Sequence, residues 1–205
     1  VFPGYVDPAH DIGTLGPDGW LTTGDIGYMT ADERLVLTGR EKDLIVRSGH
    51  NIDPAAIEDV ANRFPGVHIS AAVGMPDQYA GEVPALFVVP APGARIDVEA
   101  LKAYLDANVH EPPARPKSVL VIEALPVTAV GKIFKPELRD LAIREKVRLE
   151  VERICGQDVS AAIGVSLDAR KRTCVDVRLA GATPAQRAEL EAALQLLPQT
   201  FVVEG

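Results

Sequence analysis

Residues 39–54 read Gly-Arg-Glu-Lys-Asp-Leu-Ile-Val-Arg-Ser-Gly-His-Asn-Ile-Asp-Pro and combine charge, glycine and a helix start within sixteen positions. Asp53 and Pro54 form an N-cap and first-turn pair. The apolar residues after them are spaced three and four apart, which predicts an amphipathic helix. Opposite charges and glycines directly ahead of a helix suit a hinge beside a phosphate-rich ligand.

Outward from this stretch, the chain alternates strand and helix signals. Residues 69–73 and 85–89 are apolar runs that predict buried strands, with a polar turn between them that carries Gly81. Asp97 caps a second predicted helix, which ends before Pro112, and residues 119–122 predict a third strand. A short sheet flanked by helices is therefore expected, which is an α+β fold.

The last third of the chain predicts a further α+β unit. Pro136 opens a long helix that runs to about Ile154. The segments after it predict two paired strands, a helix and a closing strand, over residues 159–167, 173–180, 184–196 and 200–203. This order suits a ferredoxin-like unit if an upstream strand joins the sheet.

The first 39 residues differ from the rest. They are rich in Gly, Asp and Pro and contain only short strand-like pieces, such as residues 34–38. Such pieces cannot enclose a core of their own. We therefore expect this segment to be the trailing edge of a larger N-terminal domain.

Composition excludes several classes of partner. The chain has 205 residues with 47% hydrophobic and 24% charged side chains, which is ordinary for a soluble globular protein. The formal charge of −8 argues against nucleic acid or an anionic membrane as the main partner. No apolar run is long enough for a transmembrane helix. Cys155 and Cys174 are too few to staple the chain, so reduced thiols in the cytoplasm and no metal site are expected.

Two residues near the start offer groups that could hold a nucleotide. Asp25 follows Thr23-Gly24 in a predicted turn, and a fixed carboxylate can accept hydrogen bonds from both hydroxyls of a ribose. Arg40 carries a planar, permanently charged fork suited to ribose oxygens or phosphate. The competing interpretations are an ordinary surface turn at Asp25 and a solvated charged turn at Arg40.

Two later loops offer further candidates. In Ser48-Gly49-His50, the glycine removes a side chain where another chain could pass, and the histidine could bind phosphate when charged. Lys132, in a loop that begins at Pro126, could stabilise the negative charge that builds on a phosphate under attack. The alternatives are a turn glycine with an exposed histidine, and a solvent-exposed loop lysine.

Three motifs occur in an order and with gaps that resemble one family, namely Thr23-Gly24-Asp25, residues 39–54 and the loop from Pro126 to Lys132. The chain resembles the C-terminal part of an acyl-CoA synthetase of the adenylate-forming superfamily over about residues 1–140. The resemblance implies that residues 1–41 end a large N-terminal domain and that residues 42–140 form the small mobile C-terminal domain. Residues 141–205 then form an extension beyond it.

The resemblance also implies a role for each candidate residue. It makes Asp25 and Arg40 nucleotide-binding residues, Lys42 the hinge between the two domains, and Lys132 the catalytic residue of adenylation. Ser48, Gly49 and His50 would line the path of CoA.

The implied reaction has two steps. A carboxylic acid and ATP, with Mg²⁺, form an acyl-adenylate and pyrophosphate, and CoA then displaces AMP. The partners are the missing N-terminal domain and the acid, with a homodimer possible through the extension, and the fragment alone should be inactive and bind no cofactor tightly. Two alternatives stay open, namely a domain that loads a carrier-protein thiol and a non-catalytic scaffold module.

Overall fold

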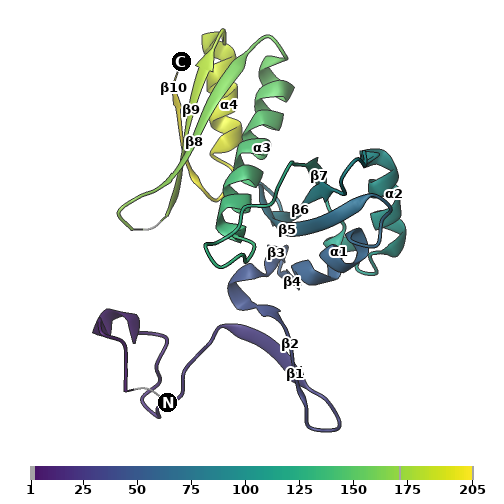
Figure 1. Cartoon of the computed structure of the whole chain (residues 1–205). Coiled ribbons are helices and arrows are strands. Elements are labelled where there is room, and N and C mark those ends of the chain that lie inside the picture. The colour runs from purple at the N-terminus through teal and green to yellow at the C-terminus, as the bar shows by residue number, and fades with distance from the viewer. Residues whose placement is uncertain (1–2, 171, 205) are drawn as a thin grey trace. The chain divides into compact units, whose positions relative to one another are not determined.

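The computed structural model describes residues 3–170 and 172–204. The chain divides between Asp43 and Leu44 into two compact units, which are described separately below. Figure 1 shows the elements of both units in chain order.

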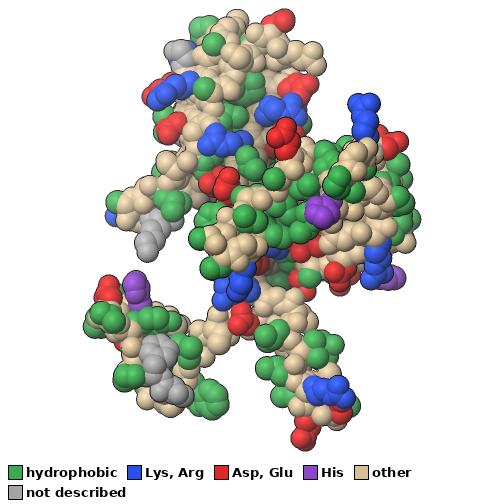
Figure 2. Space-filling model, viewed as in Figure 1, with side chains coloured by type: hydrophobic (Ala, Val, Ile, Leu, Met, Phe, Trp, Pro, Cys, Tyr) green, Lys and Arg blue, Asp and Glu red, His purple; other side chains and the backbone are tan. Residues whose placement is uncertain are grey.

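The first unit is a hairpin with irregular flanks. It contains the 3-10 turns η1 (Pro8–His10) and η2 (Glu41–Asp43) and the antiparallel strands β1 (Asp25–Met29) and β2 (Leu35–Arg40). None of its described residues is buried, and hydrophobic side chains lie on the surface of the hairpin in Figure 2. The prediction that this segment encloses no core is confirmed.

The second unit begins with a five-stranded sheet. Its strands are β3 (Ile45–Arg47), β4 (His50–Ile52), β5 (Val67–Asp77), β6 (Gly81–Pro90) and β7 (Ser118–Val121). The order is β4-β3-β6-β5, and β7 pairs with β6 in parallel. The predicted strands at 69–73, 85–89 and 119–122 are therefore confirmed. The first two are longer than predicted, because β5 and β6 continue as an antiparallel hairpin to Asp77 and Gly81.

The first two helices begin where the sequence predicts. Asp53 caps α1 (Pro54–Ala61) by accepting a hydrogen bond from Ala55 N at 2.9 Å. Asp97 caps α2 (Val98–Asn108) in the same way from Ala100 N at 3.0 Å. Each cap satisfies a backbone donor that the helix itself leaves unpaired.

The central strand β6 has a core on each of its faces. Leu86 packs with α1 and α2 in one cluster, whereas its neighbour Phe87 packs with Leu138 of the third helix in another. This alternation follows from the two-residue period of a strand. It explains why β6 reads as a continuous apolar run in the sequence.

Helix α3 (Lys135–Cys155) joins the sheet to the extension (Figure 1). Leu138 and Ala142, in its first half, belong to the core around β5 and β6. Val147 and Val151, in its second half, belong to a separate core in the extension. The predicted long helix is confirmed, and it contributes to two cores at once.

The extension forms a three-stranded sheet that packs against α3 and α4. Its elements are β8 (Ser160–Leu167), β9 (Thr173–Ala180), α4 (Pro184–Leu194) and β10 (Thr200–Glu204). The predicted element order is confirmed, and β8 and β9 pair as an antiparallel hairpin. However, β10 pairs directly with β9 in parallel, and no upstream strand joins this sheet among the described residues. The sheet thus has one strand fewer than a ferredoxin-like unit.

Three further findings concern membrane-spanning helices, metal-ligand clusters and the charge of the surface. No helix within residues 3–170 and 172–204 is both long and apolar enough to cross a bilayer. The same residues contain no cluster of three or more His, Cys, Asp or Glu side chains that could hold a metal ion. Around α3 and β8–β10, the face shown in Figure 2 has acidic and basic side chains interspersed.

Candidate functional site

The hairpin of the first unit brings two predicted nucleotide-binding residues together. Asp25 and Arg40 are paired across β1 and β2, fifteen residues apart in the sequence. Arg40 Nε donates a hydrogen bond to Asp25 Oδ1 at 2.9 Å, and the two side chains remain 51% and 32% exposed. A carboxylate and a guanidinium are therefore held side by side on a surface that a ligand can reach.

The backbone before Asp25 is shaped by a turn. Gly24 has a φ of +71°, which favours glycine, and its carbonyl accepts a hydrogen bond from Glu41 N at 2.8 Å. Asp25 N donates to Thr23 Oγ1 at 3.1 Å. These contacts fix the start of β1 against the end of β2, so the position of the carboxylate is set by the backbone.

Lys42 lies in the short turn η2, one residue before the last residue of the first unit. Its side chain is exposed. Hinges are typically a few residues at the ends of elements that absorb changes in φ and ψ. Lys42 therefore lies one residue before the boundary between the two units, and its role as a hinge stays a prediction.

Ser48 and Gly49 form the two central residues of a tight turn between β3 and β4. Their φ angles are +49° and +82°, and Arg47 and His50 pair on either side of them. Positive φ at both central positions is the mark of a type I′ hairpin turn. A Cβ on Gly49 would meet no atom within 4 Å. Within this chain, glycine is therefore required by the backbone conformation and not by a close neighbour.

The turn is fastened to the rest of the unit on two sides. Ser48 N donates to Ala80 O at 2.8 Å, and Arg47 Nη1 donates to Pro113 O at 2.6 Å. A cavity of about 340 Å³ lies beside it, lined by Arg47, Ser48, His50, Pro112 and Pro113. Sequence reasoning missed Arg47, because its partner is a backbone carbonyl 66 residues away.

Asp77 stabilises the turn between β5 and β6, in which Ala80 O accepts the hydrogen bond from Ser48 N. Its Oδ1 accepts hydrogen bonds from Tyr79 N and Ala80 N at 3.0 and 2.9 Å. Burial would raise the pKa of Asp77, but these N–H donors and the charges of Lys146 and Arg47 outweigh burial and lower the pKa. Asp77 is consequently held as a carboxylate near neutral pH.

Lys132 lies in a small hairpin between β7 and α3. Thr128 N donates to Lys132 O at 2.7 Å, and Lys132 N donates to Thr128 Oγ1 at 3.2 Å. Gly131 has a φ of +78°, and Val127 bridges to Ile133 at the base. The backbone of this loop is thus well bonded while the Lys132 side chain is exposed. Lys132 lies in a different loop from the Ser48–Gly49 turn and does not line the cavity beside that turn.

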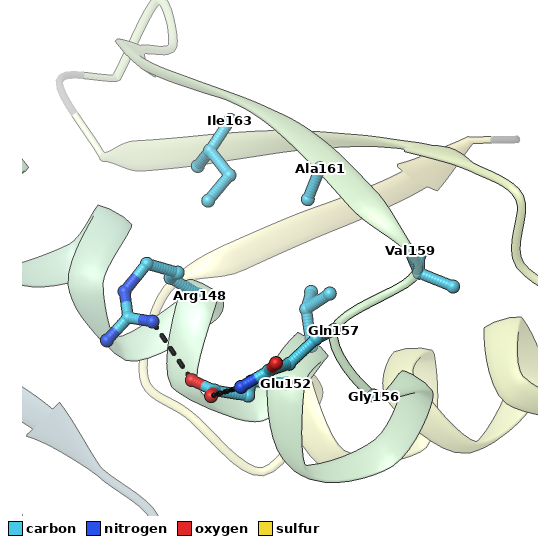
Figure 3. A pocket seen from close by; sticks show the side chains of 8 residues that line it. Arg148, Glu152, Gly156, Gln157, Val159, Ala161 and Ile163 are labelled. Carbon is cyan, nitrogen blue, oxygen red and sulfur yellow. Dashed lines mark hydrogen bonds and ion pairs between the residues drawn. The ribbon is translucent and has the colours of Figure 1, made fainter.

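A second cavity lies in the extension, away from the predicted site residues. Its volume is about 320 Å³, and it lies between α3 and β8. Figure 3 shows Ala161 and Ile163 on the strand and Arg148 and Glu152 on the helix. Arg148 Nη1 donates to Glu152 at 3.0 Å. None of the predicted site residues lines this cavity.

Comparison with known proteins identifies the domain. Residues 56–132 match the family of the AMP-binding enzyme C-terminal domain. A marinolic acid–CoA ligase from Pseudoalteromonas sp. is 40% identical over 199 residues, which are 97% of this chain and 30% of that protein. A feruloyl-CoA synthase from Amycolatopsis sp. is 41% identical over 139 residues, 68% of this chain and 28% of that protein. The chain therefore spans less than a third of the length of these relatives.

Solved structures give the same result. ATP-bound MatB from Rhodopseudomonas palustris has a TM-score of 0.64 at 33% identity, over 69% of this chain and 28% of that one. The amide bond synthetase McbA from Marinactinospora thermotolerans has a TM-score of 0.61 at 35% identity, over 68% and 28%. The expected resemblance and the α+β fold of the small domain are confirmed. Residues 56–132 form an AMP-binding enzyme C-terminal domain, and the chain is similar to acyl-CoA synthetase-like proteins of the adenylate-forming family over the part of them that it spans.

Proposed function

We propose that the full-length protein carrying this chain is an AMP-forming acid–thiol ligase. The carboxylate attacks the α-phosphate of ATP to form an acyl-adenylate and pyrophosphate, and the thiol of CoA then takes the acyl group and releases AMP. The observation that carries this proposal is the family match over residues 56–132, at whose end a tightly bonded hairpin presents Lys132 to solvent. CoA ligases among the relatives support the choice of reaction.

In the first step, Lys132 stabilises the negative charge that develops on the α-phosphate of ATP. Attack of the acid carboxylate on the α-phosphate of ATP builds negative charge, and one positioned ammonium can stabilise it by a few kcal/mol, on the order of 3. Asp25 accepts hydrogen bonds from the ribose hydroxyls. Arg40 holds Asp25 in place and also contacts the nucleotide. Mg²⁺ would enter bound to the ATP phosphates.

In the second step, the turn at Ser48-Gly49-His50 guides CoA. The cavity beside the turn offers an arginine, a histidine and two proline rings, which suit the mixed polar and apolar pantetheine arm. Rotation about Lys42 exchanges the Lys132 loop for this turn at the reaction centre.

An N-terminal domain completes the enzyme in this proposal. Large hydrophobic side chains of the first unit, including Trp20 at 77% exposure and Ile12 at 83%, are exposed in this chain. A cluster of such side chains is typical of a surface that another domain covers. We propose the boundaries 1–41, 42–140 and 141–205, with α3 crossing from the small domain into the extension.

The extension is proposed to mediate a homodimer. Strand β8 is an edge strand of eight residues, with no charge, proline or irregular register against β9. Monomeric proteins usually protect such edges with one of these features. Antiparallel pairing of β8 with its copy across a two-fold axis would protect the edge. Sedimentation of the chain and of Ala162→Lys, at an exposed position of β8, tests this, since an unchanged, monomeric mass for both would contradict it.

The reaction is tested with the full-length protein, ATP, Mg²⁺ and a panel of acids. Aromatic acids such as salicylate, coumarate and ferulate belong in the panel, because relatives are named for them. We expect acid-dependent pyrophosphate release without CoA and thioester formation with it. Parallel assays with a carrier-protein thiol and with an amine cover the other acceptors, the amine being suggested by the likeness to McbA. Absence of acid-dependent pyrophosphate release would refute the proposal and favour a scaffold module.

A further inference from the structure

Lys135, the first residue of α3, makes a partly buried ion pair three residues after Lys132. Its Nζ lies 2.9 Å from Glu58 Oε1 of α1, and the two side chains are only 17% and 18% exposed. The same Nζ donates to Ala72 O of β5 at 3.4 Å. The start of α3 is therefore tied to both α1 and the sheet.

The pair also completes the hydrogen bonding of a strand edge. Strand β5 pairs with β6 on one side only, so the polar backbone groups on its outer edge need other partners. Ala72 N donates to Glu58 Oε1 at 2.8 Å, and Ala72 O accepts from Lys135. Glu58, Lys135 and Ala72 thus form a closed set of contacts, which we call the α1–β5–α3 clamp.

The clamp lies at the base of the Lys132 hairpin. Phe134 N, next to Lys135, donates to Pro126 O at 2.8 Å, which closes the hairpin at the residue before α3. The next contact toward the tip is the bridge between Val127 and Ile133. An unbroken series of bonded residues therefore connects the clamp to the backbone of Lys132.

We infer that Glu58 is a positioning residue for Lys132, acting through Lys135. This inference rests on the proposed function, in which the Lys132 ammonium must meet charge that develops on a phosphate. Misplacing a catalytic group by about 1 Å can lower the rate by about a hundredfold. Loss of the clamp frees the hairpin base, so it should impair adenylation and leave the CoA step, which uses a different loop, unchanged.

The first test compares Glu58→Gln with a matched control in the full-length protein. Glu150→Gln removes a carboxylate from the Lys146–Glu150 pair, which has the same burial (17% and 16% exposed) and lies farther along α3. We expect Glu58→Gln to lower the rate of acyl-adenylate formation by about tenfold or more. Thioester formation from supplied acyl-adenylate should stay at the wild-type rate. Glu150→Gln should change neither rate.

The second test measures hydrogen exchange and does not depend on the activity of the enzyme. In the chain of 205 residues, Glu58→Gln should speed amide hydrogen exchange at Gly131 and Lys132, whereas Glu150→Gln should not. If Glu58→Gln fails to fold, Glu58→Met with Lys135→Met removes the pair without leaving a lone buried charge, and the same results are expected. Equal loss of both half-reactions, or exchange like that of the control, would overturn the inference. A wild-type protein without adenylation would refute the proposed function, with the exchange result still deciding on the clamp.

Discussion

Lys132 and Lys135 are three residues apart but have opposite surroundings. The Lys132 side chain is exposed, whereas Lys135 is held by Glu58 and the backbone of Ala72. A long flexible ammonium side chain is suited to reaching a ligand only if its backbone is fixed. In the proposed function, Lys135 fixes the base of the loop and Lys132 acts on the substrate.

The Asp25–Arg40 pair is expected to serve binding and not stability. Because both side chains are exposed, their ion pair should contribute at most about 1 kcal/mol to folding. We predict that Asp25→Asn raises the KM for ATP about tenfold or more, since a hydrogen bond to a charged group contributes roughly 1.5–3 kcal/mol. Thermal unfolding should be nearly unchanged. Asp32→Asn, in the exposed Arg34–Asp32 pair of the same hairpin, is the control and should leave the KM unaltered.

Gly49 is predicted to be required by its backbone conformation. Gly49→Ala adds no clash, yet an L-residue at a φ of +82° should lower the free energy of unfolding by about 1–2 kcal/mol. Urea unfolding of the chain measures this. Gly164→Ala in β8, where the added Cβ makes ordinary contacts no closer than 3.7 Å, should be neutral or stabilising. Equal effects of the two changes would contradict the explanation.

At the scale of elements, the β3–β4 turn depends on its anchor at Pro113. Arg47→Met keeps the apolar stem but removes the donor to Pro113 O, so the turn should become mobile. We predict a rise of about tenfold in the KM for CoA, on the order of the roughly 1–3 kcal/mol lost with such a bond. Pyrophosphate release without CoA should be unaffected. Arg63→Met, at an exposed arginine after α1, is the matched control, and equal KM values in both variants would contradict a role for the anchor.

Helix α3 should show a dependence of stability on pH that involves Glu150. Burial would raise the pKa of Glu150, but hydrogen bonds from Lys146 and Arg153 outweigh burial and lower the pKa. A lowered folded-state pKa means that the stabilisation is present above the unfolded value of about 4.3 and is lost as pH falls through the folded value. The stability difference between wild type and Glu150→Gln should therefore shrink in acid.

Urea unfolding from pH 7 to pH 3 checks this dependence. Glu191→Gln, at an exposed position on α4, should show little difference from wild type at any pH. A difference for Glu150→Gln that stays constant with pH would show that the pair does not stabilise the charged form.

Local signals were enough to predict most elements. The caps at Asp53 and Asp97 and the apolar runs of β5 and β6 lie within a few residues of the structure they specify. Arg47 and Glu58 could not be found in this way, because their partners Pro113 and Lys135 are 66 and 77 residues away. The sheet order of the extension was also out of reach, since the direct pairing of β9 with β10 depends on which strands are present.

For the whole molecule, α3 determines how the parts cooperate within the second unit. It begins at the clamp beside the Lys132 loop, packs on β5 through its first half, and enters the core of the extension through its second half. The alignment with the marinolic acid–CoA ligase covers 97% of the chain, so it includes most of the extension. Helix α3 therefore provides a continuous connection between the extension and the Lys132 loop.

The central claim is that Lys132 serves adenylation in a two-step ligase. The most direct measurement compares wild type and Lys132→Ala in the full-length protein, with pyrophosphate release and thioester formation from supplied acyl-adenylate and CoA followed separately. Lys102→Ala, at an exposed lysine of α2, is the control. We predict that Lys132→Ala loses pyrophosphate release by on the order of a hundredfold or more while thioester formation continues. Survival of both steps at the wild-type rate would contradict the assignment of Lys132 and, with it, the proposed use of the hairpin.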